Sequence, residues 1–349
     1  WYCFVEDERY YVLGDDSDRI TKNKEEMSAK TAVLLMTFAR SRYARQVFDR
    51  IKDAKPEKFY FYSNKAREGR PTEVAENEEI RSWVKEVDWP CELHTFFRDE
   101  YVDVYTSTRG AMDWVFENEE AAVIFEEDCV PSVAFFDFCD RLLERYKNDE
   151  SIGYISGANY IENYVACGGD HFKSLVNNYW GFAIWRDRWQ GLDFDVDPKD
   201  VVAGGYIDRY YWSKKMRVFY RFVMSESADF IRRTKVWDFV LTLANYKKKR
   251  YGIYPVVSLV RNIGAYGSHT DGGMDPGTYV STVYEGAEYP FSLLSEPLCD
   301  KTWDMAMFRK ILLHTGRSIV IKMYLYEIFG DKIYGKFISV FRKIKKWRS

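Results

Sequence analysis

Short apolar runs alternate with amphipathic stretches from Thr31 onward. Residues 31–38 (TAVLLMTF) make a continuous apolar run with the length of a buried strand, and apolar positions four apart from Tyr43 to Ile51 then predict one face of a helix. Further strands are predicted at residues 58–64, 92–97, 121–125 and 152–155, and further helices at residues 78–87 and 107–118. Strand and helix units in series predict an α/β fold, with a doubly wound, mostly parallel sheet and helices on both faces.

The two ends of the chain lack this alternation. The N-terminal residues begin with an aromatic run and then turn acidic, whereas the C-terminal residues interleave apolar and basic positions at helical spacing, with glycines as breaks between short helices. The pattern therefore predicts a hairpin or tether at residues 1–30, one main domain at 31–300 with halves 31–160 and 161–300, and a basic amphipathic helical extension at 301–349.

Three consecutive acids, Glu126, Glu127 and Asp128, follow the apolar run AAVIF, and Pro131 is predicted to open the next helix in its first turn. Adjacent carboxylates at the end of a buried strand repel one another unless a cation or hydrogen-bond donors neutralise them. Mg²⁺ and Mn²⁺ prefer oxygen ligands and usually take one or two protein carboxylates together with water and substrate phosphate. The triplet therefore indicates a metal site for a nucleotide diphosphate, and the alternative is an exposed acidic turn.

Composition narrows the class of protein. The chain has 349 residues, 46% of them hydrophobic and 18% aromatic, so it can bury a large core and stack on flat ligands. The net charge of −3 combines a basic end with an acidic body, which argues against a nucleic-acid partner. Six scattered cysteines without a C-x-x-C pair favour a reduced, cytoplasmic protein, and no apolar run has the length of a membrane span.

Several segments, in the same order, resemble a known family. IFEEDCVPSVAFFDF is similar to the strand, acidic triplet and helix of N-acetylglucosaminyltransferase I and of related bacterial glycosyltransferases of the GT-A type. The resemblance extends from about Thr31 to Thr270 and includes TFARSRYARQVFDRI, RGAMDWVFENEEAAVIFEEDC, YWGFAIWRDRW and KVWDFVLTLANYKKKRYGIYPVVSLVRNIG. It implies a GT-A catalytic domain that transfers a sugar from a nucleotide-diphosphate sugar with inversion, with residues 31–160 as the nucleotide-sugar half and 161–300 as the acceptor half.

The resemblance also assigns roles to individual residues. It implies that Asp128 binds Mn²⁺ or Mg²⁺ directly, that Glu126 and Glu127 hold ribose, metal-bound water or neighbouring groups, and that Arg40 lies near the base. It makes Asp238, in TKVWDF, the candidate general base that takes the proton of the acceptor hydroxyl. Without the flanking matches, Asp238 is an acid near a helix start, where the helix dipole favours it.

The remaining candidate residues keep two interpretations each. His269 binds the metal or the diphosphate, or is an ordinary loop histidine. Asn64 ends the second strand and is a candidate to read the base, and Arg109 offsets phosphate charge or forms a salt bridge on a helix surface. Trp180 and Gly181 shape the acceptor pocket or pack in the core.

The expected activity is an inverting, metal-dependent transfer to a glycan or lipid-linked acceptor in the synthesis of surface polysaccharide or lipopolysaccharide, with a UDP-linked sugar as the expected donor. A nucleotidyltransferase on the same fold and a non-catalytic sugar- or nucleotide-binding module remain as alternatives. The basic C-terminal segment (FISVFRKIKKWRS) either lies on an anionic membrane surface, which makes the protein peripheral to the membrane, or packs on the catalytic domain.

Overall fold

The computed structural model describes residues 28–161, 170–264, 283–289, 299–314, 319–330 and 333. Most of the predicted N-terminal hairpin or tether, the candidate ligand His269 and the basic segment at residues 334–349 lie outside the described residues.

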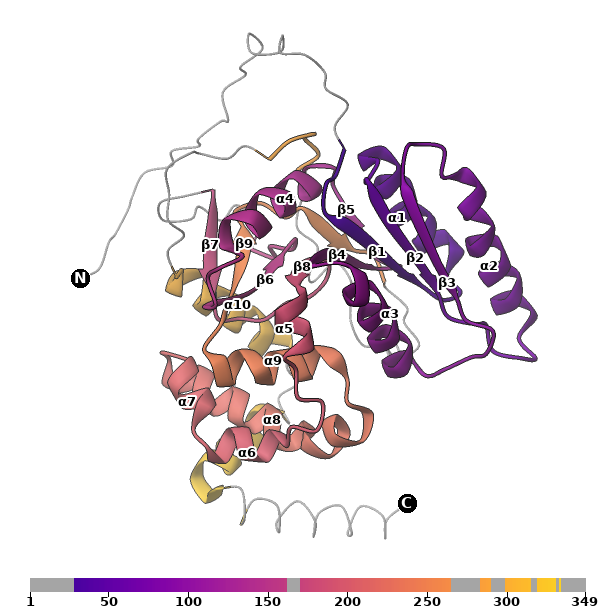
Figure 1. Cartoon of the computed structure of the whole chain (residues 1–349). Helices are drawn as coiled ribbons and strands as arrows, with labels where there is room; N and C mark the ends of the chain where they lie inside the picture. The colour runs from indigo at the N-terminus through magenta and orange to yellow at the C-terminus, as the bar shows by residue number, and fades with distance from the viewer. Residues whose placement is uncertain are drawn as a thin grey trace.

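Eight strands form one mixed sheet in the order β3-β2-β1-β4-β8-β6-β9-β7 (Figure 1). The four strands β1 to β4 are mutually parallel, β6 pairs parallel with β9, and β7 and β8 each run antiparallel to their neighbours. The strand bounds are β1 Ala32–Thr37, β2 Lys58–Ser63, β3 Glu92–Phe97, β4 Ala121–Glu126, β6 Ile152–Ser156, β7 His171–Ser174, β8 Phe182–Trp185 and β9 Tyr251–Pro255. The predicted α/β fold is confirmed, and its parallel part is concentrated in β1 to β4.

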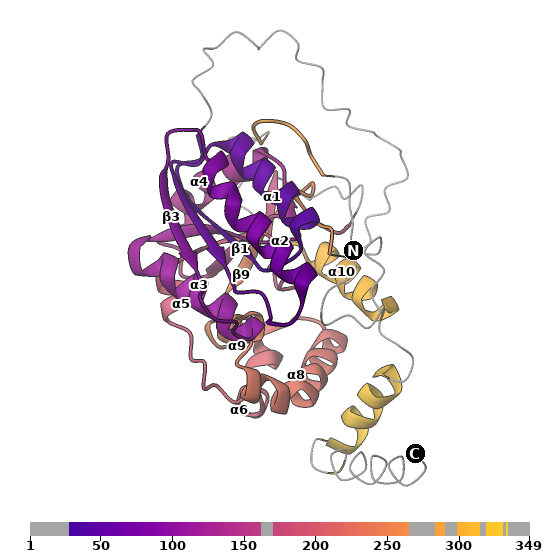
Figure 2. The same cartoon turned by 90° about the vertical axis from the view of Figure 1, so that its right-hand side faces the viewer.

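Helices cover both faces of the sheet because the strands are apolar on both faces. Val33 and Leu35 of β1 belong to a core shared with α1, α2 and α4, whereas Leu34 belongs to a second core shared with α3, α8, α9 and α10. Figures 1 and 2 show the arrangement of these helices around the sheet. The helix bounds are α1 Ser41–Ala54, α2 Pro71–Ser82, α3 Val104–Asn118, α4 Ala134–Tyr146, α5 Arg186–Gln190, α6 Pro198–Ala203, α7 Tyr206–Tyr210, α8 Lys214–Thr234, α9 Trp237–Lys248 and α10 Lys301–His314, and a further helix spans residues 319–330.

Local sequence explains where two of these helices begin. The carboxylate of Asp103 accepts hydrogen bonds from the backbone N–H groups of Tyr105 and Thr106, so it caps α3. α2 begins at Pro71, earlier than the apolar spacing predicts, because proline is favoured in the first turn of a helix. Only Val74 and Ala75 are apolar between Pro71 and Ile80, so the apolar pattern does not reveal this start.

The prediction that Pro131 opens a helix is wrong. Pro131 ends the short strand β5 (Cys129–Pro131), which pairs antiparallel with β10 (Val260–Asn262), and α4 begins only at Ala134. A proline fits this two-stranded ribbon because it lies at the end of the strand, where a missing N–H costs little. The β5–β10 ribbon brings residues 260–264 next to the acidic triplet.

The chain order of the strands creates the opening for a site. β2 and β3 lie on one side of β1, and β4 lies on the other side, so the connections diverge between β1 and β4. In open α/β sheets, ligands bind outside the carboxyl ends of the strands at such a switch point. Residues that follow β1 and β4 therefore have the most favourable position for ligand contact.

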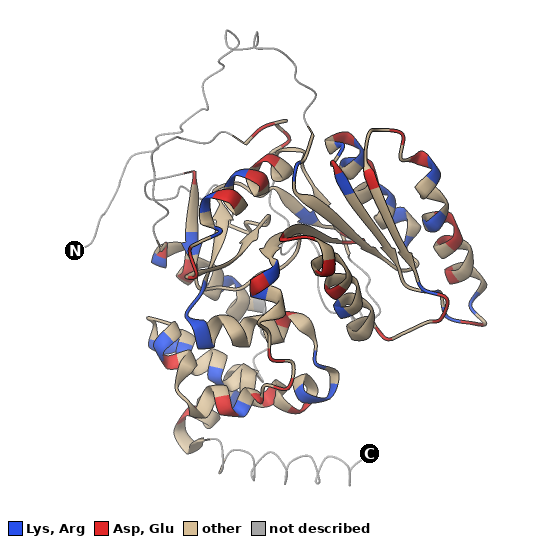
Figure 3. Ribbon diagram, in the orientation of Figure 1, with Lys and Arg blue, Asp and Glu red and all other residues tan. Residues whose placement is uncertain are grey.

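Positions occupied by Lys or Arg are interspersed with positions occupied by Asp or Glu along the ribbons of α2 and α4 (Figure 3). α10 is attached to the sheet through Asp304, which accepts a hydrogen bond of 2.6 Å from the Ser174 hydroxyl. In the part of the chain that the structure describes, no helix is both long and apolar enough to cross a membrane.

Candidate active site

The acidic triplet meets Arg40 at the switch point of the sheet. Met36 of β1 is in register with Glu126 of β4, so the residues that follow the two strands lie side by side. The Arg40 guanidinium donates to Glu127 Oε1 at 2.6 Å and to Asp128 Oδ2 at 2.9 Å. The backbone N–H of Phe38 donates to the other oxygen of Glu127 at 2.8 Å. Two of the three carboxylates therefore bind the same protein cation.

The charge balance of this cluster is unfavourable without a further cation. Glu127 and Asp128 are 5% and 9% exposed, so their charges are poorly screened by water. Burial, together with the charges of Asp128 and Asp238, raises the pKa of Glu126 to about 8. Burial also raises the pKa of Glu127, although Arg40 opposes the shift. Among the described residues, one guanidinium would face three negative charges if Glu126 were also ionised, and a divalent cation would neutralise that excess.

The donor atoms at this position fit a hard cation. Ligand atoms of Glu126, Asp128 and Cys129 lie within 4.8 Å of one another. Burial and the charges of Asp128 and Glu126 raise the pKa of the Cys129 thiol well above its usual value, and sulfur suits softer metals than Mg²⁺ or Mn²⁺. The carboxylates of Glu126 and Asp128 are then the ligands that this cluster offers, and carboxylate oxygens suit Mg²⁺ or Mn²⁺.

Gly264 lies against the Asp128 carboxylate. The backbone N–H of Ile263 donates to the Asp128 carbonyl at 2.8 Å, and a β-carbon at Gly264 would be 2.1 Å from Asp128 Oδ2. Only glycine allows the backbone to approach the carboxylate this closely. His269 follows five residues later, outside the described residues.

A cavity of about 610 Å³ opens over the carboxyl ends of β1, β2 and β4. Its polar wall contains Arg40, Asn64 and the acidic triplet, and its aromatic wall contains Phe38 and Tyr101. The Phe38 and Tyr101 rings are 5.9 Å apart, and Tyr101 is 46% exposed, so its face is accessible to a flat ligand. We call this space the donor cavity; it combines a wall that contains the acidic triplet with an aromatic wall.

A second cavity of about 460 Å³ adjoins it and contains Asp238. Asp238 lies in the first turn of α9, where its carboxylate accepts a hydrogen bond of 2.8 Å from the Phe239 N–H. Burial raises the pKa of Asp238 above its usual value. We call this space the acceptor cavity; its other walls are largely aromatic and apolar, with rings from Tyr105, Tyr160, Tyr179, Trp180, Tyr211, Tyr220, Trp237, Phe239 and Tyr246.

The two cavities share one wall, formed by Val104, Tyr105, Thr108 and Glu126. Glu126 therefore faces both spaces, and the charge of Asp238 contributes to its raised pKa. A ligand at the metal cluster and a second ligand beside Asp238 would meet at this wall.

The structure distributes the other predicted site residues unevenly. Asn64 lines the donor cavity, but its amide is engaged with the backbone of Val102 and Lys65. Trp180 lines the acceptor cavity. Gly181 lies behind that wall with φ +63°, and a β-carbon there would be 2.7 Å from Val260, so glycine is needed for packing.

The structure does not bring Arg109 to either cavity. Arg109 pairs with Asp113 at 3.4 Å, one turn along α3, and its guanidinium lies 4.0 Å from the centre of the Phe194 ring. This is the helix-surface arrangement that the sequence left open as the alternative.

Sequence reasoning missed residues that line the donor cavity, namely Phe38, Arg67, Tyr101 and Asp103. Phe38 follows β1, Arg67 follows β2, and the other two lie between β3 and α3. Their positions just after parallel strands were a usable signal, because all such positions share one edge of the sheet. The same signal identifies Tyr105 less well, because that residue already belongs to α3.

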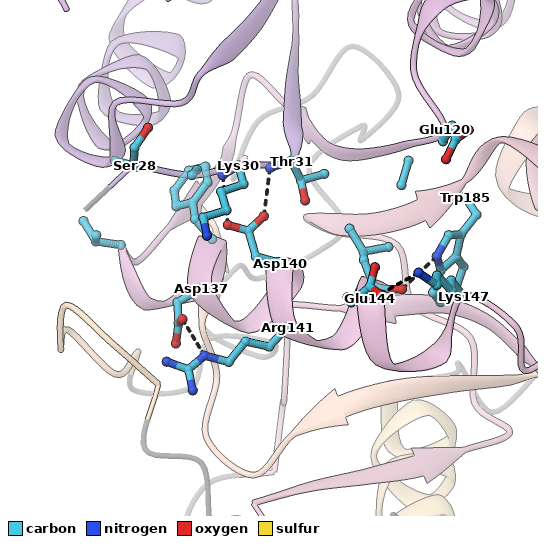
Figure 4. Close-up of a pocket in the computed structure, with 16 residues that line it drawn as sticks. Ser28, Lys30, Thr31, Glu120, Asp137, Asp140, Arg141, Glu144, Lys147 and Trp185 are labelled. Carbon is cyan, nitrogen blue, oxygen red and sulfur yellow. Dashed lines mark hydrogen bonds and ion pairs between the residues drawn. The ribbon is translucent and has the colours of Figure 1, made fainter. Parts of the chain in front are cut away.

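A third cavity, of about 700 Å³, lies at the opposite edge of the sheet, beside the start of β1 and along α4 (Figure 4). Three of its acids already have partners within the protein: the Asp140 carboxylate accepts hydrogen bonds from the backbone N–H groups of Lys30 and Thr31, Asp137 pairs with Arg141, and Glu144 pairs with Lys147 (Figure 4). Acids that are partnered in this way give no indication of a ligand.

Comparisons with known proteins identify no family for this chain. No protein-family model matches it, and no curated protein matches it. Similar solved structures include residues 1–349 of TarS from S. aureus, at 7% identity, and the mannosyltransferase PcManGT from Pyrobaculum calidifontis in complex with GDP-Man and Mn²⁺, at 14% identity. Each match covers 62% of this chain and 72% of the other chain with a TM-score of 0.32, which is too low to carry an argument about residues or activity.

Proposed function

We propose that this chain is a metal-dependent, inverting glycosyltransferase of the GT-A type. The observation that carries the proposal is the shared wall of the two cavities, where Glu126 faces both the acidic cluster and the space that contains Asp238. A transferase that joins two substrates needs two adjoining sites whose reactive groups meet, and a simple binding module needs only one.

The donor cavity suits a nucleotide-diphosphate sugar. The aromatic side formed by Phe38 and Tyr101 offers a stacking surface for the base, and Asp128 and Glu126 offer oxygen ligands for Mn²⁺ or Mg²⁺. When bound, the ion would neutralise the diphosphate as the leaving group forms. Arg40 holds Glu127 and Asp128 in place, and its fork of N–H donors fixes the direction of both carboxylates.

Asp238 acts as the general base in the acceptor cavity. The acceptor hydroxyl oxygen attacks the anomeric carbon, its proton passes to the Asp238 carboxylate, and the bond between that carbon and the diphosphate oxygen breaks, which inverts the anomeric configuration. The raised pKa of Asp238 supports this role because a carboxylate with a higher pKa is a stronger base. Trp180 offers an aromatic surface for the acceptor.

We further propose a UDP-linked sugar as the donor and a glycan or lipid-linked hydroxyl as the acceptor, in the synthesis of surface polysaccharide or lipopolysaccharide in the cytoplasm. These finer assignments, and His269 as a second ligand of the metal or diphosphate, rest on the resemblance to N-acetylglucosaminyltransferase I and its bacterial relatives.

Asp238→Asn tests the proposal. The variant should bind the nucleotide sugar as wild type does but lose about 10²- to 10⁴-fold in turnover, because the amide cannot accept the hydroxyl proton. Donor binding is read as the thermal shift produced by a panel of nucleotide sugars with and without Mn²⁺, and turnover as release of the nucleoside diphosphate.

The matched control is Asp229→Asn, which changes an acid with a side chain 87% exposed on α8. This control should leave both measurements unchanged. Equal turnover in Asp238→Asn and wild type would exclude Asp238 as the base, and the absence of any Mn²⁺-dependent shift across the panel would exclude the donor site.

A further inference from the structure

Exposed large apolar side chains are concentrated near the end of the described chain. Twelve such residues are exposed in the described part of the molecule, and seven of them lie between residues 313 and 333: Leu313, Ile319, Ile321, Tyr324, Ile328, Phe329 and Ile333. Isolated exposed apolar residues are normal on a protein surface, but a contiguous group marks an interaction site.

The helix of residues 319–330 is held against α8 by one of its faces. Met323 and Tyr326 are 7% and 6% exposed. The Tyr326 ring lies 5.8 Å from that of Phe222, its hydroxyl is 2.9 Å from the Ser225 hydroxyl, and Glu327 pairs with Arg221 at 3.0 Å. These contacts fix which face of the helix points outward.

The outward face of this helix is also apolar. Ile321, Tyr324 and Ile328 are 61%, 58% and 71% exposed. Their spacing of three and then four residues places them in one stripe along the helix. A helix that is apolar on two opposite faces is expected where both faces are covered, but the contacts with α8 cover only one. Figure 2 shows this helix at the periphery of the molecule, in yellow below α10.

The charge of the sequence that follows indicates what covers the stripe. Residues 334–349 contain six Lys and Arg and no Asp or Glu. An apolar stripe that is followed in the sequence by a dense group of cations suits a surface that is apolar inside and negatively charged outside. An anionic lipid bilayer has both properties, whereas a second copy of this chain would bring its own six cations to the same contact.

We infer that the stripe of Ile321, Tyr324 and Ile328 docks on an anionic lipid bilayer. The apolar side chains enter the boundary between head groups and acyl chains, and the positive charge of the sequence that follows adds electrostatic attraction to the anionic head groups. This inference concerns a surface outside both cavities and holds whatever reaction the protein catalyses.

Flotation of the full chain with vesicles tests it. We expect the wild type to float with vesicles of phosphatidylcholine that contain about 30% phosphatidylglycerol and not with phosphatidylcholine alone, and to lose most binding at about 0.5 M salt. The double variant Ile321→Ser/Ile328→Ser should reduce the partition coefficient at least tenfold. The matched control is Val257→Ser, which removes an exposed apolar side chain between β9 and β10 and should bind as wild type does.

A gain of binding provides a second measurement. Ile321→Trp/Ile328→Trp should raise the partition coefficient several-fold, because tryptophan favours the membrane interface. Circular dichroism and thermal unfolding verify that both double variants fold. No flotation with anionic vesicles, equal flotation of wild type and the serine variant, or a dimer of the wild type that the serine variant abolishes would each overturn the inference, the last in favour of an interface between two copies.

Discussion

The donor and acceptor cavities share a wall but are built in opposite ways. The wall of the donor cavity contains seven charged side chains, and Arg40 compensates Glu127 and Asp128 directly. In the acceptor cavity, aromatic rings dominate. The buried acid Asp304 lies one turn of α10 before the lining residue Met307 and accepts hydrogen bonds from the neutral groups Ser174 Oγ, Leu175 N and Trp212 Nε1. The same problem, a carboxylate out of water, is solved by an ion pair in one region and by neutral donors in the other.

The difference suggests how the two regions divide their work. A cluster with excess negative charge can attract a cation and a phosphate, whereas a wall of rings can hold an uncharged sugar or a lipid chain. Substitutions that remove a charge should therefore have their largest effect in the donor region. Substitutions that remove an aromatic ring should weaken binding of a ligand only in the cavity that the ring lines.

The largest expected effect is the loss of the ion pair in the donor region. Arg40→Met keeps much of the side-chain volume but leaves Glu127 and Asp128 without their cation, and breaking a buried pair costs about 3–5 kcal/mol. Urea unfolding measures the change in free energy. The control Arg45→Met removes a partly exposed arginine that pairs with Asp49 and Glu86, and it should cost less than about 1 kcal/mol. Equal losses in the two variants would mean that the donor region does not depend on this charge.

The next effect concerns the buried acid of the acceptor region. Burial raises the pKa of Asp304 to about 6, above its unfolded value near 3.8. The folded state therefore binds more protons between these pH values, so this group stabilises the fold at low pH and the contribution is lost as pH rises through 6. The loss is up to about 3 kcal/mol, from 1.36 kcal/mol for each pKa unit.

Asp304→Asn should remove this slope because an amide has no proton to lose in that range, while its oxygen still accepts from Ser174. Unfolding free energies at pH 4, 5, 6 and 7, compared between the variant and wild type, isolate the contribution of Asp304 from those of the other buried acids. A difference that stays constant from pH 4 to 7 would contradict the predicted titration.

Sequence reasoning was most successful in the donor region, for a physical reason. β1, β2 and β4 are mostly apolar runs, amphipathic helices lie between them and β3 in the sequence, and parallel strands place their carboxyl ends at one edge. Glu126 to Asp128 and Arg40 follow such strands, so their approach could be predicted before the structure was known. The pairing of Arg40 with two of the three acids could not, because it depends on side-chain directions across the gap between β1 and β4.

The acceptor region could be predicted only in outline. Its walls combine Tyr105 from α3, Trp180 from the loop before β8, Asp238 from α9 and Met307 from α10, which are far apart in the sequence. The spacing of apolar residues within one segment does not predict which distant segments come together in the fold. Asp238 was selected through a resemblance, and the aromatic wall as a whole was not predicted, because an aromatic residue in a helix has the same local signal whether it lines a cavity or packs in the core.

The smallest effects should separate the two regions most sharply. Tyr101→Leu removes an exposed ring from the donor cavity, and Trp180→Leu removes a half-buried ring from the acceptor cavity. A lost aromatic stacking contact costs about 1 kcal/mol, or about fivefold in affinity. Tyr101→Leu should therefore weaken donor binding about fivefold and leave the acceptor KM unchanged, whereas Trp180→Leu should raise the acceptor KM by a similar factor and leave donor binding unchanged. If either variant changes both constants equally, the shared wall couples the cavities, and the rings of the two regions act as one site.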